Sequence, residues 1–386
     1  MNSLRDKAIG ALMAAAVGDA IGGATEGRSA EEIVQRYGGH VQGVVDNFMP
    51  DWRTAKPMSP YFKGDGHITD DTLMTNLLVD VYVKNRRHLT AFDMADDLVP
   101  MMMTQLTWIP ELEKETVPLL RVFLAEKWLV TRLHYGHVDP REAGVGNVVN
   151  CGAAMYMAPV GIANAGDPPG AYAEAVEISG AHQSSYGREA AAVFAAAVAA
   201  ALTPDIGVDA VLAAVLELAR DGTRSAIAAV IEVADTISDW ETAIHVLRQA
   251  VSPFDSVGDS YRHPAQDSRR PSRLRAIEEL PVALGLLKVT GGDVRGCILG
   301  ATNYGRDSDS IATMAGAIAG ALGGESSVPA EWVDAVATGS RMDLRAGGLA
   351  MATVAEEIFA ADAARFHGRT TAMSSLGAST LEEIGQ

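Results

Sequence analysis

The sequence predicts an all-α fold in a single compact multi-helix domain. Apolar residues recur at the three- and four-residue spacing of amphipathic helices, and almost no stretch alternates apolar and polar residues as a strand does. Hydrophobic residues make up 48% of the 386 residues, enough to bury a substantial core. We assign this domain to residues 1–366 and expect residues 367–386, rich in Ser, Thr, Gly and Ala, to form a mobile C-terminal tail.

The expected helices follow this spacing along the chain. Ser3 is an N-cap candidate, so the first helix is expected over Leu4 to Val17, and a short helix is expected at Ala30–Tyr37. Further helices are expected at residues 70–84, 90–106, 116–132, 208–220, 224–236, 239–250, 275–288, 311–322, 329–338 and 348–364, with a long Ala- and Val-rich helix within residues 179–202.

Small residues are spaced so that helices can pack closely. Gly316, Gly320 and Gly324 lie four residues apart, on one face of a predicted helix. In a soluble helical protein this spacing permits two backbones to cross at short distance.

The charge balance excludes some classes of partner. The chain carries 49 Asp and Glu against 31 Lys and Arg, a formal net charge of −18, which argues against general nucleic-acid binding and against binding to anionic membranes. No apolar run approaches the roughly 20 residues of a membrane span. Cys151 and Cys297 are far apart and lack metal-ligand spacing, so free thiols and a cytoplasmic location are expected.

An acidic stretch stands at the start of the helix expected at residues 311–322. Asp307 and Asp309 are two residues apart, with Ser308 and Ser310 beside them and Gly305 before them. One carboxylate would serve as an N-cap at the positive end of the helix dipole, which is the simpler interpretation. A second carboxylate adds like-charge repulsion unless a cation lies between the two, and Mg²⁺ and Mn²⁺ take such oxygen ligands.

Two upstream segments have related features. Thr69, Asp70 and Asp71 stand at the start of the helix expected at residues 70–84. The glycine-rich segment 18–27, expected to be a loop after the first helix, presents Glu26, while its Asp19 is expected to bond neighbouring backbone. If the two acidic helix starts converge, their oxygen atoms suffice for two divalent ions with positions left for water.

In this order, the three segments resemble the motifs of the ADP-ribosylglycohydrolase family. The match comprises residues 18–22 with Glu26, then residues 69–72, then residues 305–312, and the resemblance spans roughly residues 8 to 325. It implies cleavage of the bond at ribose C1 of an ADP-ribosyl group or related N-riboside, with Glu26 and Asp309 as catalytic carboxylates. It also implies two Mg²⁺ (or Mn²⁺) ions, held by Thr69, Asp70, Asp71, Asp307, Asp309 and Ser310.

The resemblance further implies a ligand pocket near Gly152, Tyr156, His182 and Arg306. Tyr156 stands where family members commonly have arginine, Arg306 where a second glycine is usual, and Ser310 where threonine is usual. These departures make a small ribosyl compound a rival to an ADP-ribosylated protein as the substrate. Without the family, His182 is more simply a hydrogen-bonded residue at a helix start.

Three other interpretations stay open at this stage. The chain could be a catalytically inactive member that binds a ligand or serves structurally, although five acidic residues in the matching positions argue for activity. A metal-dependent phosphatase would use the same two-ion chemistry. The basic stretch at residues 262–275 could bind a pyrophosphate, or be a solvated loop and helix start.

Overall fold

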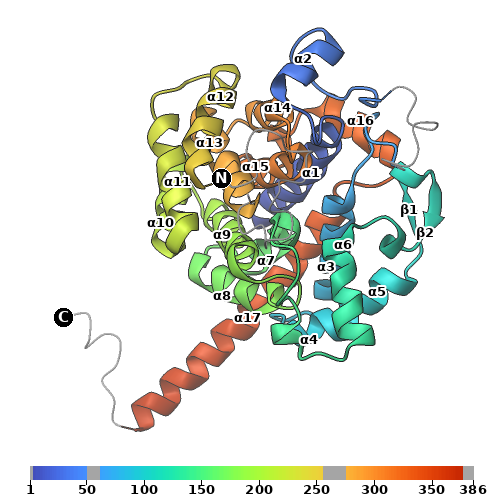
Figure 1. The fold of residues 1–386 in the computed structure, drawn as a ribbon. Coiled ribbons are helices and arrows are strands. Elements are labelled where there is room, and N and C mark those ends of the chain that lie inside the picture. The colour runs from blue at the N-terminus through green and yellow to red at the C-terminus, as the bar shows by residue number, and fades with distance from the viewer. Residues whose placement is uncertain (1–2, 50–60, 255–274, 377–386) are drawn as a thin grey trace.

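Two helices that are buried along most of their length run through the middle of the protein. The computed structural model describes residues 3–49, 61–254 and 275–376. Helices α1 (Leu4–Gly23) and α15 (Ser308–Gly323) pack against each other, with α14 (Val294–Tyr304) beside them (Figure 1). A methyl group at Gly320 would overlap the carbonyl oxygen of Gly10, so the two backbones are in direct contact. The close crossing predicted from the glycine spacing is confirmed.

Helix α1 is longer than the sequence predicts. The glycine-rich segment from Gly18 onward was expected to be a loop, but the helix continues to Gly23. Glycine is a poor helix former in isolation. Here a side chain at Gly22 would collide with the backbone of Ser308, so packing against α15 requires glycine at this position. Tertiary contact therefore overrides the local preference.

Two groups of helices flank this centre. Figure 1 shows α10 to α13 gathered on one side of α14 and α15, and α3 to α6 on the other. The predicted all-α architecture is confirmed. The other α-helices of the body are α2 (Ala30–Tyr37), α3 (Asp70–Asn85), α4 (Ala91–Asp93), α5 (Val99–Thr104), α6 (Leu124–Leu129), α7 (Ala158–Ala163), α8 (Pro168–Ser179), α9 (Ser185–Ala201), α10 (Val208–Leu218), α11 (Asp221–Ala234), α12 (Trp240–Val251), α13 (Arg275–Val289) and α16 (Ala330–Ser340).

The segment from residue 90 to 135 departs most from the predicted helices. A small antiparallel hairpin, β1 (Thr107–Ile109) and β2 (Lys114–Thr116), lies where no strand was expected, because three-residue strands are too short to show alternation. The helix expected at residues 90–106 contains a π-helical turn, and the one expected at residues 116–132 is broken into separate turns around α6. The shorter turns are the π-helical Met94–Leu98 and Val130–Tyr135 and the 3₁₀ turns Pro110–Leu112, Pro118–Leu120, Pro140–Glu142, Cys151–Ala153, Ser252–Phe254 and Glu325–Ser327.

The last helix, α17 (Ala346–Ser375), was expected to end near residue 364. Its first half packs on α1 and α3, while its second half projects from the body and is exposed to solvent (Figure 1). The helix therefore extends into the predicted tail, whose residues 377–386 lie outside the described part of the chain.

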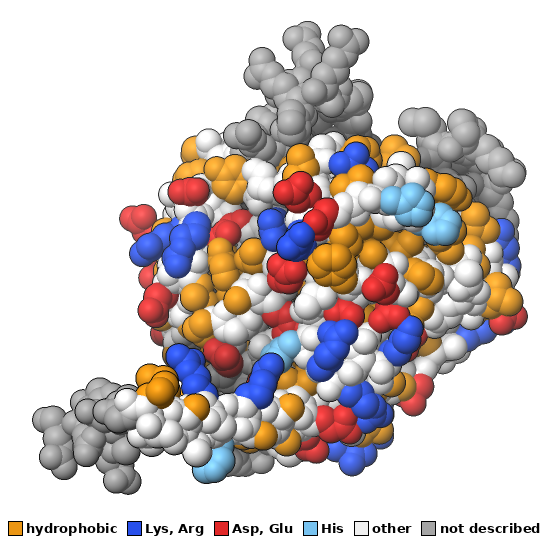
Figure 2. Space-filling model, turned by 90° about the horizontal axis from the view of Figure 1, so that it is seen from below, with side chains coloured by type: hydrophobic (Ala, Val, Ile, Leu, Met, Phe, Trp, Pro, Cys, Tyr) orange, Lys and Arg blue, Asp and Glu red, His pale blue; other side chains and the backbone are white. Residues whose placement is uncertain are grey.

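Charged side chains are mixed on the surface. On the face shown in Figure 2, Lys and Arg lie among Asp and Glu and do not gather in one basic patch. Within the described residues, none of the helices combines the length and the apolar character that a membrane crossing needs.

Candidate metal centre

The start of helix α3 is fixed by one buried carboxylate of helix α1. Asp19 Oδ2 accepts hydrogen bonds from the backbone N–H of Thr69 (2.9 Å) and of Thr72 (3.1 Å), and both hydroxyls donate to the same carboxylate. Asp19 thus caps the helix in the way that an N-cap side chain does, as expected. Its bonds place Asp70 and Asp71 in the first turn, next to α1.

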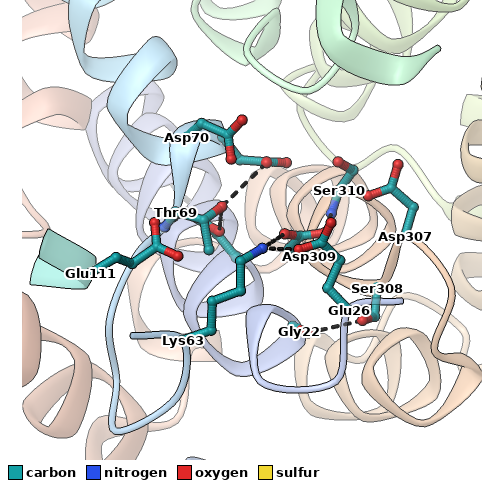
Figure 3. A network of polar contacts seen from close by, with 12 residues as sticks. Gly22, Glu26, Lys63, Thr69, Asp70, Glu111, Asp307, Ser308, Asp309 and Ser310 are labelled. Atoms are coloured by element: carbon teal, nitrogen blue, oxygen red, sulfur yellow. Dashed lines mark hydrogen bonds and ion pairs between the residues drawn. The ribbon is translucent and has the colours of Figure 1, made fainter. Parts of the chain in front are cut away.

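The start of helix α15 is bound to the segment after α1. Arg306 has a positive φ of 57° and exchanges backbone hydrogen bonds with the chain at Gly27 (2.6 Å) and Arg28 (2.8 Å). The Ser308 hydroxyl donates to the Gly22 carbonyl at 2.8 Å. Glu26 therefore lies beside the first turn of α15 (Figure 3).

Four of the predicted carboxylates meet where these helix starts converge. One atom from each of Asp19, Asp71 and Asp309 lies within 4.8 Å of the other two, and the same holds for Glu26, Asp307 and Asp309. Asp71 Oδ1 is buried, and among the described residues no hydrogen-bond partner lies within reach of it. A buried anionic oxygen without a partner is costly, so this donor set fits a hard divalent cation.

The electrostatics of this cluster are those of crowded, buried anions. Burial raises the pKa of Asp71 well above its ordinary value, and the charges of Asp309 and Asp19 raise it further. Burial likewise raises the pKa of Asp19 to about 7 and that of Asp309 to about 6. Proteins arrange such shifts where a cation or a reacting group is to be held.

Two basic side chains that sequence reasoning missed belong to the same centre. Lys63 forms an ion pair with Glu26, and its Nζ lies 3.2 Å from Asp309 Oδ2 (Figure 3). Arg121, fully buried, lies 3.1 Å from Asp70 Oδ1 and also pairs with Glu111. Neither Lys63 nor Arg121 stands in a motif, so no local signal in the sequence marks them.

A cavity of about 320 Å³ opens beside these carboxylates. Another wall comes from the start of α6 and from the 3₁₀ turn at Cys151, including the predicted Gly152. Burial raises the pKa of Glu126, on that wall, to about 8. The cavity is lined by Glu26, Asp70, Asp71, Phe123, Leu124, Ala125, Glu126, Val148, Asn150, Cys151, Gly152, Met155, Asp307, Asp309 and Ser310.

The cavity lining does not include three of the predicted ligand-pocket residues. Tyr156 and His182 are fully buried behind the wall: the Tyr156 hydroxyl donates to His182 Nδ1 (3.0 Å), and His182 Nε2 donates to the Ala125 carbonyl (3.0 Å). Burial lowers the pKa of His182 to about 4, which keeps the ring neutral. Arg306 points away and pairs with Glu278 at 2.8 Å. The predicted ligand Thr69 also lies outside the lining, next to Asp19.

Most of the basic stretch predicted as either a pyrophosphate site or a solvated loop, residues 262–274, lies outside the described part of the chain.

Residues 1–366 match the family model described as ADP-ribosylglycohydrolase. The chain belongs to the ADP-ribosylglycohydrolase family. The resemblance seen in the motifs is thereby confirmed across almost the whole chain, and with it the assignment to hydrolases that act on ADP-ribosyl groups.

Individual relatives are distant. The ADP-ribosylarginine hydrolase Tri1 of Pseudomonas putida is 27% identical over 341 residues, which cover 86% of this chain and 74% of that protein. An uncharacterized protein of Archaeoglobus fulgidus is 27% identical over 343 residues, covering 86% of this chain and 92% of the relative. A solved "ADP-ribosylglycohydrolase-related protein complex" superposes with a TM-score of 0.57 at 20% identity, covering 91% of this chain and 99% of that one, and it supports the fold.

Proposed function

We propose that this protein is a divalent-metal-dependent hydrolase that cleaves the bond between ribose C1 and the acceptor in ADP-ribosylated arginine. The observation that carries the proposal is the meeting of Glu26, Asp71, Asp307 and Asp309 at one end of the cavity, with a buried oxygen of Asp71 left without a hydrogen bond among the described residues. A binding-only protein has no need to retain so unfavourable a group of charges.

The carboxylates fit two Mg²⁺ or Mn²⁺ ions. Asp71, Asp307, Asp309 and the Ser310 hydroxyl would hold them, since all four line the cavity. When bound, such ions supply positive charge that orients the ribose hydroxyls and activates a water molecule. The Thr69 hydroxyl donates its hydrogen bond to Asp19, and its oxygen lone pairs could still bind a metal ion.

Glu26 is the residue best placed to move a proton. It lies at the rim of the acidic cluster, its side chain is 24% exposed, and it reaches the cavity. A carboxylate in that position can accept the proton of the attacking water as the C1 bond breaks. Asp309, deeper in the cluster, orients the same region, with its Oδ1 accepting the Ser310 backbone N–H at 3.1 Å.

The acceptor is assigned to arginine on two grounds. The relative in Pseudomonas putida is an ADP-ribosylarginine hydrolase by name. The cavity is also lined by several acidic residues, Glu26 among them, and a carboxylate can accept the paired N–H groups of a planar arginine guanidinium. The sequence argument for a smaller riboside depended on Tyr156, Arg306 and Ser310. The first two lie outside the cavity lining, and Ser310 keeps a hydroxyl there.

The test is product analysis with matched substrates. Purified protein is incubated with Mn²⁺ or Mg²⁺ and with peptides ADP-ribosylated on arginine or on serine, beside free N-ribosides. We expect free ADP-ribose, fastest from the arginine peptide. If only the free N-ribosides are cleaved, to ribose and base, the protein is a nucleoside hydrolase and the proposal is wrong. Release of inorganic phosphate would indicate a phosphatase.

Matched variants connect the activity to the centre. Asp309→Asn is expected to abolish release of ADP-ribose, whereas Asp209→Asn, which changes an exposed carboxylate 81% accessible at the side chain, is expected to leave the rate unchanged. Equal rates in the two variants would contradict the assignment of the centre. We place the enzyme in the cytoplasm, as its two free cysteines suggest.

A further inference from the structure

Lys63 lies among the carboxylates that are proposed to hold metal. Its Nζ pairs with Glu26 and lies 3.2 Å from Asp309 Oδ2, and only 12% of its side chain is exposed. Figure 3 shows the lysine reaching into the centre from a loop that is separate from α3 and α15. An ammonium group is a compact point charge with three donors, so it satisfies two carboxylates as a small cation does.

The Lys63 ammonium lies beside one of the two sets of three acidic residues that could bind a metal ion. Glu26, Asp307 and Asp309 each offer an oxygen within 4.8 Å of the others, and Lys63 contacts two of these three residues. A divalent ion bound to the same oxygen atoms would be repelled by an ammonium at this distance. Lysine and metal therefore compete for the group.

The loop that carries Lys63 is fixed at its backbone. The Phe62 N–H donates to the Glu111 carbonyl (2.9 Å), and the Asp65 N–H donates to the Val45 carbonyl (2.8 Å). Leaving the centre would thus involve only the flexible four-carbon side chain, at low cost to the rest of the fold.

A second place for the ammonium exists nearby. Glu111 is fully buried; its Oε2 pairs with Arg121, and its Oε1 has no hydrogen-bond partner among the described residues. Figure 3 shows Glu111 on the side of Lys63 away from Asp309. The Phe123 ring lies beside both positions: its centroid is 5.9 Å from Lys63 Nζ and 4.9 Å from the guanidinium carbon of Arg121.

We propose that Lys63 is an internal counter-cation that holds Glu26 while no divalent ion is bound and moves toward Glu111 when the metal enters. This inference rests on the metal dependence proposed above. Binding of the metal ion then also breaks the ion pair between Lys63 and Glu26. The Glu26 carboxylate becomes free for proton transfer. Metal occupancy and the availability of Glu26 are coupled through one side chain.

The test is direct measurement of Mn²⁺ binding by calorimetry, which does not depend on turnover. Lys63→Met keeps most of the side-chain length and removes the charge. We expect about tenfold tighter Mn²⁺ binding if Lys63 occupies the centre for about nine-tenths of the time. We also expect a lower Tm without metal, because Glu26 and Asp309 lose their counter-charge.

The control is Lys84→Met, which removes the same charge from a lysine whose side chain is 58% exposed and pairs with Asp97. Its Mn²⁺ affinity should equal that of the wild type. Lys63→Gln serves as a second neutral variant if the methionine variant folds poorly. Introduced alone, Glu111→Gln should weaken Mn²⁺ binding relative to wild type. Introduced together with Lys63→Met, it should leave the Mn²⁺ affinity of Lys63→Met unchanged.

The outcomes separate the two proposals. If wild type binds Mn²⁺ and the neutral Lys63 variants bind it equally or less tightly, the counter-cation role is wrong and the metal centre stands. If wild type binds no Mn²⁺, the proposed metal dependence is wrong, and the role of Lys63 falls with it.

Discussion

Acidic residues lie near both ends of helix α3, but their surroundings differ. Beyond its C-terminal end, Glu174 accepts hydrogen bonds from the Tyr82 hydroxyl, the Leu89 N–H and Asn164, and it also contacts His88. At the N-terminal end, Asp71 lies among other carboxylates, with one oxygen lacking a partner among the described residues.

Other acidic groups near the C-terminal end are also paired. Asp93 accepts two hydrogen bonds from Arg87, at 2.7 and 2.9 Å, and Asp97 is contacted by Lys84 and Asn85. Buried charges that are paired in this way are structural. The comparison teaches that acidic residues alone do not mark a functional site, whereas acidic residues in excess of their partners do.

The largest expected effect comes from Asp71→Asn. The cleavage rate should fall by about three orders of magnitude, or roughly 4 kcal/mol of transition-state stabilisation, because a ligand of the centre is lost. The Tm without metal should be equal to or above that of wild type, since one anion leaves a repulsive cluster. Rate assays and calorimetric melting of the same preparation measure both. If Asp71→Asn stays active but is less stable than wild type, Asp71 has a structural role and is not a metal ligand.

The opposite result is expected at the other end of the helix. Glu174→Gln leaves the cationic His88 without its strongest partner, so the free energy of unfolding should fall by about 3 kcal/mol. The cleavage rate below the melting transition should remain that of wild type, because Glu174 lies outside the lining of the cavity. Urea unfolding beside the rate assay tests this. If fully folded Glu174→Gln loses activity, Glu174 is not purely structural and the two ends of α3 do not differ in the way described.

The smallest expected effect is a dependence of stability on pH from His88. Its two ring nitrogens lie 2.6 Å from Glu174 and 2.9 Å from Asp362, and the hydrogen bond to Glu174 raises its pKa from 6.5 to about 9. The stabilisation is fully present below pH about 6.5 and is lost as the pH rises through about 9. The Tm of wild type should therefore fall more steeply over this window than that of His88→Gln.

The control for this measurement is His134→Gln, at an exposed position, which should keep the wild-type slope. Identical slopes for His88→Gln and wild type would show that the imidazolium contributes nothing to stability.

Local signals predicted the helix starts at which the candidate site lies. Residues 30–37 form the helix predicted for them, because Ser29 and Glu32 make a capping box. The acidic turns at Asp71 and Asp309 were likewise found from their position before apolar helical runs. These features depend on neighbours three or four residues away, which the sequence displays directly.

Features that depend on distant contacts could not be predicted. Lys63 reaches Asp309 across 246 positions of sequence, and Arg306 pairs with Glu278 across 28. Tyr156 and His182 were assigned to the pocket from the motif, but side-chain direction is decided by packing. Both lie one layer behind the cavity, where they support the wall that contains Ala125.

The contact between α1 and α15 has a consequence for motion. Side chains are absent where these backbones cross at Gly320 and Gly22, so neither helix has room to shift relative to the other, and Glu26 and Asp309 move as one unit. The other walls of the cavity are held as well. Asn147 Nδ2 and His182 Nε2 both donate to the Ala125 carbonyl, and the Cys151 thiol donates to Asp307 Oδ2 at 3.0 Å. Substrate binding is therefore expected to leave both sides of the cavity in place.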